Sequence, residues 1–330
     1  MKEIVLSGMR PTGKLHLGHW AGALSNWVKL QQNYKCFFMV ADWHALMSEY
    51  KNPSFLKETV IDNVVDWIVY GIDPQESVIF LQSQIKEHLE LFLILSFLTP
   101  LGRLFRCPTF KEQIRQLKDK EINTYGFLGY PILQCADILL YKANFVPVGE
   151  DQLPHLELCR EIARRFHFLY KKEIFPEPQA LLTKKAKLLG IDGRKMSKSY
   201  NNYIALDEED RIIEEKILSM FTDPERKRKT DKGHPQNCNV FSYYLVFKEE
   251  LKEEVYQWCS EAKKGCVDCK KSLAQIIKEF IAPKRKKKRE FLKKKEKIFD
   301  ILREGNRKAK EIASFTLEEV KEIIKVNFNL

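Results

Sequence analysis

The first part of the chain alternates short apolar runs with stretches of helical periodicity. Apolar runs at Ile4–Leu6, Cys36–Val40 and Ser77–Leu81 predict β-strands. Between these strands apolar side chains recur at helical spacing. Those between the first and second strands are Trp20, Leu24, Trp27 and Val28, and those between the second and third are Phe55, Val60, Val64 and Ile68, before Gly71. Strands alternating with helices predict a parallel sheet covered on both faces, that is, an α/β, Rossmann-like fold.

The alternation continues beyond residue 129. Tyr130–Tyr141 has the pattern of a helix, Phe145–Val148 that of a strand, and Gln152–Phe166 that of a helix whose first turn tolerates Pro154. The α/β pattern therefore extends to about residue 200.

After Asn202 the chain consists of long, highly charged helical stretches. The predicted helices are Asp207–Phe221, Phe241–Ala262, Lys270–Phe299 and a last one that begins at a Thr316/Glu319 capping box. We therefore expect two domains, an α/β domain at residues 1–203 and an α-helical domain at residues 204–330.

Composition indicates the kind of partner. Among 330 residues, 56 Lys and Arg exceed 45 Asp and Glu, which gives a net charge of +11. Clustered cations gain affinity by displacing counterions from phosphates, so a nucleic acid is a plausible partner. No apolar run approaches the roughly 20 residues that span a bilayer, and the N-terminus lacks a signal-peptide layout, so we expect a soluble cytoplasmic protein with no membrane association.

Two polar segments are candidates for chemistry on phosphates. The first, Arg10-Pro-Thr-Gly-Lys-Leu-His-Leu-Gly-His19, is called here the HxGH segment and follows the first predicted strand. Its two histidines lie near the start of a helix and can neutralise charge on a transferring phosphoryl group, while Gly18 would let adenine or ribose approach the backbone. Alone, the pattern is better explained by surface histidines and a turn glycine.

The second segment, Gly193-Arg-Lys-Met-Ser-Lys-Ser199, is called here the KMSKS loop. Lys195 and Lys198 are mobile positive charges that can follow a departing pyrophosphate, although an exposed Lys/Ser turn is the simpler alternative for this segment alone. HxGH after the first strand and KMSKS after the last one together resemble the paired motifs of class I aminoacyl-tRNA synthetases.

Three further segments resemble the tryptophanyl branch of the tryptophanyl/tyrosyl subgroup of that family. They are residues 41–45 (Ala-Asp-Trp-His-Ala), 129–141 and 146–152 (Val-Pro-Val-Gly-Glu-Asp-Gln), and with the two motifs the resemblance covers roughly residues 1–205. It implies a homodimer that activates L-tryptophan with ATP and Mg²⁺ and transfers it to tRNA(Trp), with the helical domain recognising the anticodon. A tyrosyl enzyme, an HxGH nucleotidyltransferase and a catalytically inactive RNA-binding paralogue are the alternatives.

The resemblance also implies roles for residues. His16, His19, Lys195 and Lys198 would be catalytic, the histidines at the α-phosphorus and the lysines at the pyrophosphate. Lys111 resembles a residue of a segment that approaches the substrates. The residues implied to bind ATP are Arg10, Pro11, Thr12, Gly18, His19, Gly149, Glu150, Asp151, Leu188, Lys195, Met196, Ser197, Lys198 and Ser199.

One face of the helix at 130–141 is the candidate amino-acid pocket. Tyr130, Gln134 and Asp137 stand at i, i+4 and i+7 and can line one cavity, although an amphipathic helix with these residues facing solvent is the alternative. The resemblance implies that Asp137 accepts the indole N–H, that Tyr130 and Gln134 contact the α-amino group, and that His44 and Leu6 wall the ring. Many bacterial members have methionine at 134, asparagine at 19 and glutamine at 10, and Gln134 is shared with tyrosyl enzymes.

Four of the eight cysteines are close in sequence. Cys238, Cys259, Cys266 and Cys269 have the spacing C-x20-C-x6-C-x2-C, whereas Cys36, Cys107, Cys135 and Cys159 are scattered in apolar surroundings. Four thiolates suit zinc or an iron–sulfur cluster, and four unrelated thiols are the alternative. Some tryptophanyl-tRNA synthetases carry a [4Fe-4S] cluster on a similar pattern, so the resemblance favours iron–sulfur in a structural role.

Basic runs at Lys284–Arg289, Arg226–Lys229 and Lys293–Lys295 are the last candidate feature. The first two could contact tRNA phosphates, but charge runs on helices are usually solvated faces. The sequence leaves the two interpretations open.

Overall fold

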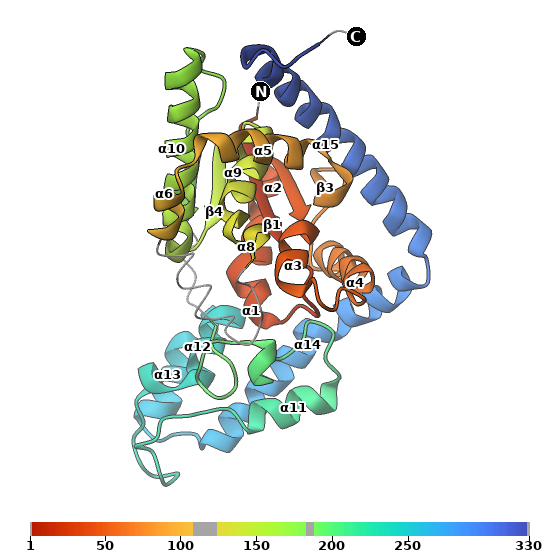
Figure 1. The fold of residues 1–330 in the computed structure, drawn as a ribbon. Coiled ribbons are helices and arrows are strands. Elements are labelled where there is room, and N and C mark those ends of the chain that lie inside the picture. The colour runs from red at the N-terminus through yellow and green to blue at the C-terminus, as the bar shows by residue number, and fades with distance from the viewer. Residues whose placement is uncertain (1, 108–123, 183–187, 329–330) are drawn as a thin grey trace.

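A computed structural model describes residues 2–107, 124–182 and 188–328 of the chain. Its centre is a five-stranded parallel sheet with the strand order β3-β2-β1-β4-β5 (Figure 1). The strands are β1 (Ile4–Met9), β2 (Lys35–Val40), β3 (Ser77–Leu81), β4 (Phe145–Val148) and β5 (Gln179–Leu182). The predicted strands and the α/β class are confirmed, and β5 is an additional strand.

Helices cover both faces of the sheet. They are α1 (Leu17–His19), α2 (Ser25–Asn33), α3 (Asp42–Glu49), α4 (Leu56–Val69), α5 (Glu87–Leu98), α6 (Leu101–Phe105), α8 (Tyr125–Leu128), α9 (Tyr130–Leu140) and α10 (Leu153–Tyr170). Along β2, Phe37 belongs to one buried apolar cluster and Phe38 to the other. Because both faces are buried, the strand is apolar throughout instead of alternating.

The chain after β5 is mainly helical. Its helices are α11 (Asp210–Leu218), α12 (Asn239–Phe247), α13 (Lys252–Ser260), α14 (Cys266–Leu292) and α15 (Lys295–Ile323). The stretch Phe241–Ala262 is thus two helices, not one. The prediction for Lys270–Phe299 is also wrong, because α14 ends at Leu292 and the next helix starts at Lys295.

The predicted Thr316/Glu319 helix start is wrong as well. Thr316 is 1% exposed and lies inside α15. The apolar stripe of this helix runs without interruption through Ala309, Ala313, Leu317 and Val320, so burial of that face continues the helix through a sequence that would otherwise resemble a cap.

The last helix, α15, returns from the helical part and runs along the edge strand β3 (Figure 1). Asn306 accepts a hydrogen bond from the backbone N–H of Leu81 at 2.9 Å. A sheet edge covered in this way is protected from pairing with other chains. The division into domains at 1–203 and 204–330 stays a prediction. It does not include the packing of α15 against the sheet of the first domain.

Among the described helices, none combines the length and the apolar character needed to cross a membrane.

Gly305 allows α15 to approach β3 this closely. A Cβ atom built on Gly305 would lie 1.8 Å from the backbone oxygen of Ile79, so any side chain there forces the helix and the strand apart. The Gly305→Ala substitution should therefore lower the free energy of unfolding by about 1–3 kcal/mol, although alanine in an open helix position would raise it by up to about 1 kcal/mol.

Thermal or urea unfolding measures this difference. Gly126→Ala in α8 is the matched control, because a Cβ at Gly126 meets nothing within 4 Å. A Gly305→Ala protein as stable as the parent would contradict the tight contact between α15 and β3.

Candidate functional site

The HxGH segment leaves the end of β1 and turns into α1. Gly13 has φ +118°, a conformation that favours glycine, and His16 is extended before the helix starts. The backbone N–H of His16 donates to Nδ1 of His19 at 3.1 Å, and the two ring centroids are 3.7 Å apart. A π-helical turn at Trp20–Leu24 follows and leads into α2. The two histidines therefore form one pair of adjacent rings, tilted by 40° to each other.

Both histidines are neutral. Burial, together with Lys198, lowers the pKa of His16 to about 3, and burial also lowers the pKa of His19. Within the described part of the chain, Nδ1 of His16 is a buried nitrogen with no hydrogen-bond partner. The pair can thus offer N–H donors to a ligand without carrying a full charge.

The KMSKS loop is held by a buried asparagine that sequence reasoning missed. Asn202 is 2% exposed; its Oδ1 accepts from the N–H of Ser197 at 2.8 Å, and its Nδ2 donates to Asp192 at 2.8 Å and to the carbonyl of Lys195 at 3.1 Å. The sequence does not indicate this role of Asn202, because two of its three partners are the backbone groups of Ser197 and Lys195.

The two motifs, far apart in sequence, meet in space. The N–H of Leu17 donates to the carbonyl of Ile204 at 3.0 Å, and the N–H of Leu206 donates to Leu15 at 3.0 Å. A Cβ on Gly13 would lie 3.2 Å from the Lys198 ammonium, and Met196 contacts Gly18. The two motifs therefore lie side by side, and the ATP contacts that the resemblance implies for them stay predictions.

The lysines of the loop differ in their surroundings. Lys195 is exposed, whereas Lys198 is partly buried between the motifs. Burial and the nearby charge of Arg10 lower the pKa of Lys198 to about 8. An anion placed between Arg10 and Lys198 would relieve their repulsion, which is what a polyphosphate chain does.

A cavity of about 350 Å³ lies beside the motifs, between β1, α3, α9 and the end of β4. All five residues predicted for the amino-acid pocket line it, namely Leu6, His44, Tyr130, Gln134 and Asp137. The polar face of α9 therefore points into a cavity and not into solvent. Arg10 and Gly149 belong to the same wall, so the cavity adjoins the HxGH segment.

Asp137 is the most constrained group in this cavity. It is 2% exposed, and its oxygens lie 2.7 Å from Nε2 of His44, 2.6 Å from Nδ1 of His88 and 2.8 Å from Nε2 of Gln82. Burial raises the pKa of Asp137, but His44 and His88 outweigh this and lower it to about 2. Asp137 is therefore an ionised, buried acceptor.

Gln82 and His88 were missed from the sequence. Gln82 lies in the turn after β3, and His88 lies in α5, where Nε2 contacts the Tyr141 hydroxyl at 2.9 Å. The predominantly apolar sequence of α5 gave no reason to single out one histidine. Only the packing of α5 against α9 brings His88 to Asp137.

Tyr130 takes part in a second buried chain of contacts. Its hydroxyl contacts Nε2 of His155, and Nδ1 of His155 lies 3.7 Å from Sγ of Cys107. Burial raises the pKa of Tyr130 above its usual range and lowers that of His155 to about 4, so both groups are neutral. The contact of Tyr130 with an α-amino group stays a prediction.

The remaining residues predicted to bind ATP lie around the motifs. Leu188 is 7% exposed and Pro11 is buried, whereas Glu150 and Asp151 are exposed in the turn that follows β4. Lys111 lies outside the described residues, and so does the side chain of Ser199. The positions of these residues do not test whether any of them contacts ATP.

The four clustered cysteines converge on one small cavity in the helical part. Cys238 lies before α12, Cys259 near the end of α13, and Cys266 and Cys269 in the first turn of α14, and all four line this cavity. Among these described residues no three sulfur atoms lie within 4.8 Å of one another. The four cysteines therefore lie around one cavity, and their role as ligands of a metal or cluster stays a prediction.

Positive groups surround this cavity. Arg226 and Lys264 line it, and Nε of Arg226 is buried without a hydrogen-bond partner in the described part of the chain. Burial raises the pKa of Cys259, and Arg226 partly offsets this. The surroundings are therefore suited to a group of negative charge.

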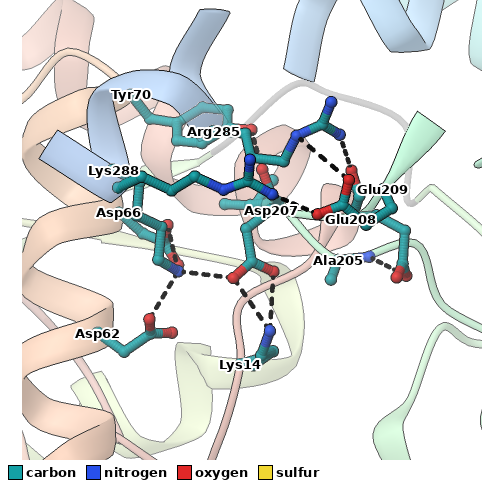
Figure 2. A network of polar contacts seen from close by, with 12 residues as sticks. Lys14, Asp62, Asp66, Tyr70, Ala205, Asp207, Glu208, Glu209, Arg285 and Lys288 are labelled. Carbon is teal, nitrogen blue, oxygen red and sulfur yellow. Dashed lines mark hydrogen bonds and ion pairs between the residues drawn. The ribbon is translucent and has the colours of Figure 1, made fainter. Parts of the chain in front are cut away.

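The basic run Lys284–Arg289 has one buried member, Lys288, and two half-buried ones, Lys284 and Arg285, whereas the other three residues are exposed. Arg285 bonds to the carbonyl of Glu208 and to Asp210, Arg289 pairs with Glu209, and Lys288 is 3% exposed. Figure 2 shows Arg285 beside Glu208 and Lys288 beside Asp62, Asp66 and Asp207. Lys286 and Lys287 are exposed. Lys288 is therefore part of a buried ion-pair network, and the two interpretations of the exposed members of the run, tRNA contact or a solvated face, stay predictions.

Known proteins resemble this chain over nearly its whole length. The family described as class I tRNA synthetases (W and Y) matches residues 2–282. A tryptophan–tRNA ligase of Thermotoga maritima is 51% identical over 327 residues, which cover 98% of this chain and 99% of that protein. One of Aquifex aeolicus is 43% identical, with 96% and 98% covered.

A solved structure agrees with these sequences. Tryptophanyl-tRNA synthetase from Campylobacter jejuni, complexed with ADP and tryptophan, has a TM-score of 0.87 and 34% identity, and the match covers 98% of this chain and 99% of that one. The chain therefore belongs to the tryptophan–tRNA ligases, within the class I tRNA synthetases.

Proposed function

We propose that the cavity beside α9 binds L-tryptophan and that the HxGH segment and the KMSKS loop bind ATP with Mg²⁺ next to it. The chain would then form tryptophanyl-adenylate and transfer the tryptophanyl group to tRNA(Trp), releasing pyrophosphate and AMP. The observation that carries this assignment is the ionised, buried Asp137 in a cavity that adjoins two cationic loops.

In the first step a carboxylate oxygen of tryptophan attacks the α-phosphorus of ATP, and the bond from that phosphorus to the bridging oxygen breaks. His16 and His19 would donate hydrogen bonds to the phosphoryl oxygens as charge develops there. Lys195 and Lys198 would accompany the departing pyrophosphate. In the second step a terminal ribose hydroxyl of the tRNA attacks the adenylate carbonyl and AMP leaves. The protein mainly contributes position and charge.

Asp137 would select the indole ring by accepting its N–H. Asp137 is itself held by His44, His88 and Gln82, so it cannot rotate away from a ligand that lacks this donor. A site of this kind discriminates by roughly 10⁴–10⁵ without editing. Tyrosine is the competing substrate, because Gln134 is shared with tyrosyl enzymes.

The Asp137→Ala substitution should lower kcat/KM for tryptophan-dependent ATP–pyrophosphate exchange by at least about a hundredfold, because a buried charged hydrogen bond to the substrate is lost. Parallel reactions with tyrosine distinguish the two substrates. Glu76→Ala, which removes an exposed carboxylate remote from the cavity, is the control. Tyrosine-dependent exchange in the parent, or a fully active Asp137→Ala protein that retains its fold, would refute the assignment.

The four clustered cysteines would hold a [4Fe-4S] cluster. A tetrahedral zinc site with Zn–S bonds of about 2.3 Å needs all four sulfur atoms roughly 3.8 Å apart, whereas no three of the described sulfur atoms lie within 4.8 Å of one another. An iron–sulfur cluster separates its ligands further and carries negative charge, which Arg226 and Lys264 would balance. When bound, it would crosslink α12, α13 and α14 in the predicted anticodon-recognition domain.

Anaerobically purified protein should therefore absorb in the visible charge-transfer region of iron–sulfur proteins, and Cys266→Ser should abolish this absorption. Because the site lies outside the ATP and tryptophan cavity, we expect exchange to stay near the parental rate while tRNA charging falls about tenfold or more. Cys36→Ser, at a buried cysteine of the sheet, is the control. A colourless protein with stoichiometric zinc would exclude the cluster.

The chain would act as a homodimer through α5 and α6. Leu89, Leu93 and Phe97 share one face of α5 and are 38%, 53% and 75% exposed, and Leu101 and Phe105 of α6 are 59% and 53% exposed. An apolar face of this extent is typical of an association surface, and most homo-oligomers are twofold symmetric. A cytoplasmic location stays a prediction.

Replacing Phe97 with lysine should convert the dimer into a monomer, because two symmetry-related charges would be buried at the contact. Light scattering or sedimentation measures the mass against 38.9 kDa for one chain. Tyr256→Lys, at an exposed aromatic of α13, should leave the mass unchanged. A parent protein with the mass of one chain would contradict the proposal.

A further inference from the structure

Lys288 of α14 is an almost completely buried lysine between two parts of the protein. Its Nζ lies 2.8 Å from Asp62, 2.9 Å from Asp66 and 3.2 Å from Asp207 (Figure 2). Burial lowers the pKa of Lys288, but the three carboxylates outweigh this and raise it above its ordinary value. Lys288 is therefore a charged group in the interior that depends on its partners.

The three carboxylates come from two places in the chain. Asp62 and Asp66 are one turn apart on α4, which packs on α14. Asp207 follows the KMSKS loop and precedes α11, and the adjacent Leu206 carbonyl accepts the Tyr70 hydroxyl at 2.6 Å. Lys288 thus fixes the position of Asp207 relative to α4.

Asp207 also holds the HxGH segment. Lys14 donates to both carboxylate oxygens of Asp207, at 3.0 and 3.2 Å. Lys14 follows Gly13, which faces the Lys198 side chain, and precedes Leu15, whose carbonyl accepts the N–H of Leu206. One carboxylate therefore bridges a buried lysine of α14 and the loop that adjoins both ATP motifs.

The charges around Lys288 are not balanced without it. Among the described residues, Lys288 and the exposed Lys14, whose side chain is 60% exposed, form the ion pairs of these three carboxylates, and Lys198 lies near enough to Asp62 to interact with its charge. Burial and the neighbours Asp62 and Asp207 raise the pKa of Asp66 to about 7, although Lys288 opposes this. Without Lys288, repulsion from Asp62 and Asp66 would displace Asp207, and with it Lys14.

We propose that Lys288 is a positioning residue for ATP binding, which acts through Asp207 and Lys14 to hold the HxGH segment and the KMSKS loop in register. The inference rests on the proposed ATP site and adds to it a residue of the helical part, distant in sequence from both motifs. Lys288 contacts no substrate in this scheme, and its effect is transmitted by the shared carboxylate.

The test is tryptophan-dependent ATP–pyrophosphate exchange by the full chain carrying Lys288→Met, with ATP and tryptophan titrated separately. We expect KM for ATP to rise about tenfold or more, since small displacements of positioning groups have effects of this size, while KM for tryptophan changes less than about twofold. A residue that only stabilised the fold would lower the active fraction, and so kcat, with KM for ATP unchanged.

Four further variants make the test decisive. Asp207→Asn should raise KM for ATP as Lys288→Met does, and the double variant Lys288→Met/Asp207→Asn should be no worse than the single ones, because both interrupt the same path. Lys14→Met, at an exposed side chain, should also raise KM for ATP, and this protein should fold even if Lys288→Met does not. Arg289→Gln removes an exposed pair with Glu209 on the same helix and should have no effect.

Unchanged KM for ATP in Asp207→Asn and Lys14→Met would overturn the proposal, as would additive effects in the double variant. A parent protein without exchange activity would instead refute the proposed function, so the two failures are distinguishable.

Discussion

The backbone pairing of Leu15–Leu17 with Ile204–Leu206 is the constraint on which the candidate site depends. It joins the turn after the first strand to the chain that leaves the KMSKS loop. Without it, the paired histidines would be fixed by the sheet while Lys198 belonged to a separate loop. The apolar side chains of both segments are buried in the core, so the pairing also anchors the two motifs to the interior of the protein.

Around this pairing, buried polar groups are arranged in two sets of different character. Asp137 is surrounded by the side chains of His44, His88 and Gln82, which keep it ionised and fixed in direction. Lys288 is surrounded by carboxylates in excess. The first set is suited to recognition of one donor on a ligand. The second is suited to holding chain segments together, since the charge of Lys288 is balanced only when its carboxylate partners lie in this one arrangement.

Much of the site could be predicted because its residues follow local patterns. Tyr130, Gln134 and Asp137 are one helical face, and the two loops carry short motifs with a known context. Residues whose role arises from packing could not be predicted. Gln82, His88 and Asn202 act on partners that are distant in the chain or are backbone groups, and α5 is too apolar throughout to indicate which face His88 occupies.

Boundaries in the helical part failed for a related reason. The sequence between Leu292 and Lys295 is uniformly basic, so nothing in its composition marks the break between α14 and α15. The packing of α15 on the sheet decides it instead. Similarly, the burial of Lys288 within the Lys284–Arg289 run could not be predicted, because its partners Asp62, Asp66 and Asp207 are distant in the chain.

The covering of β3 by α15 has a consequence for synthesis of the chain. Domains generally fold as they emerge from the ribosome, N-terminal parts first, but the helix that protects this sheet edge is made long after the strand it covers. During translation the backbone N–H of Leu81 and its neighbours therefore stay open to other nascent strands until α15 has emerged. A chaperone bound to the strand would cover it during that interval, and fast elongation through the charged helices would shorten the interval.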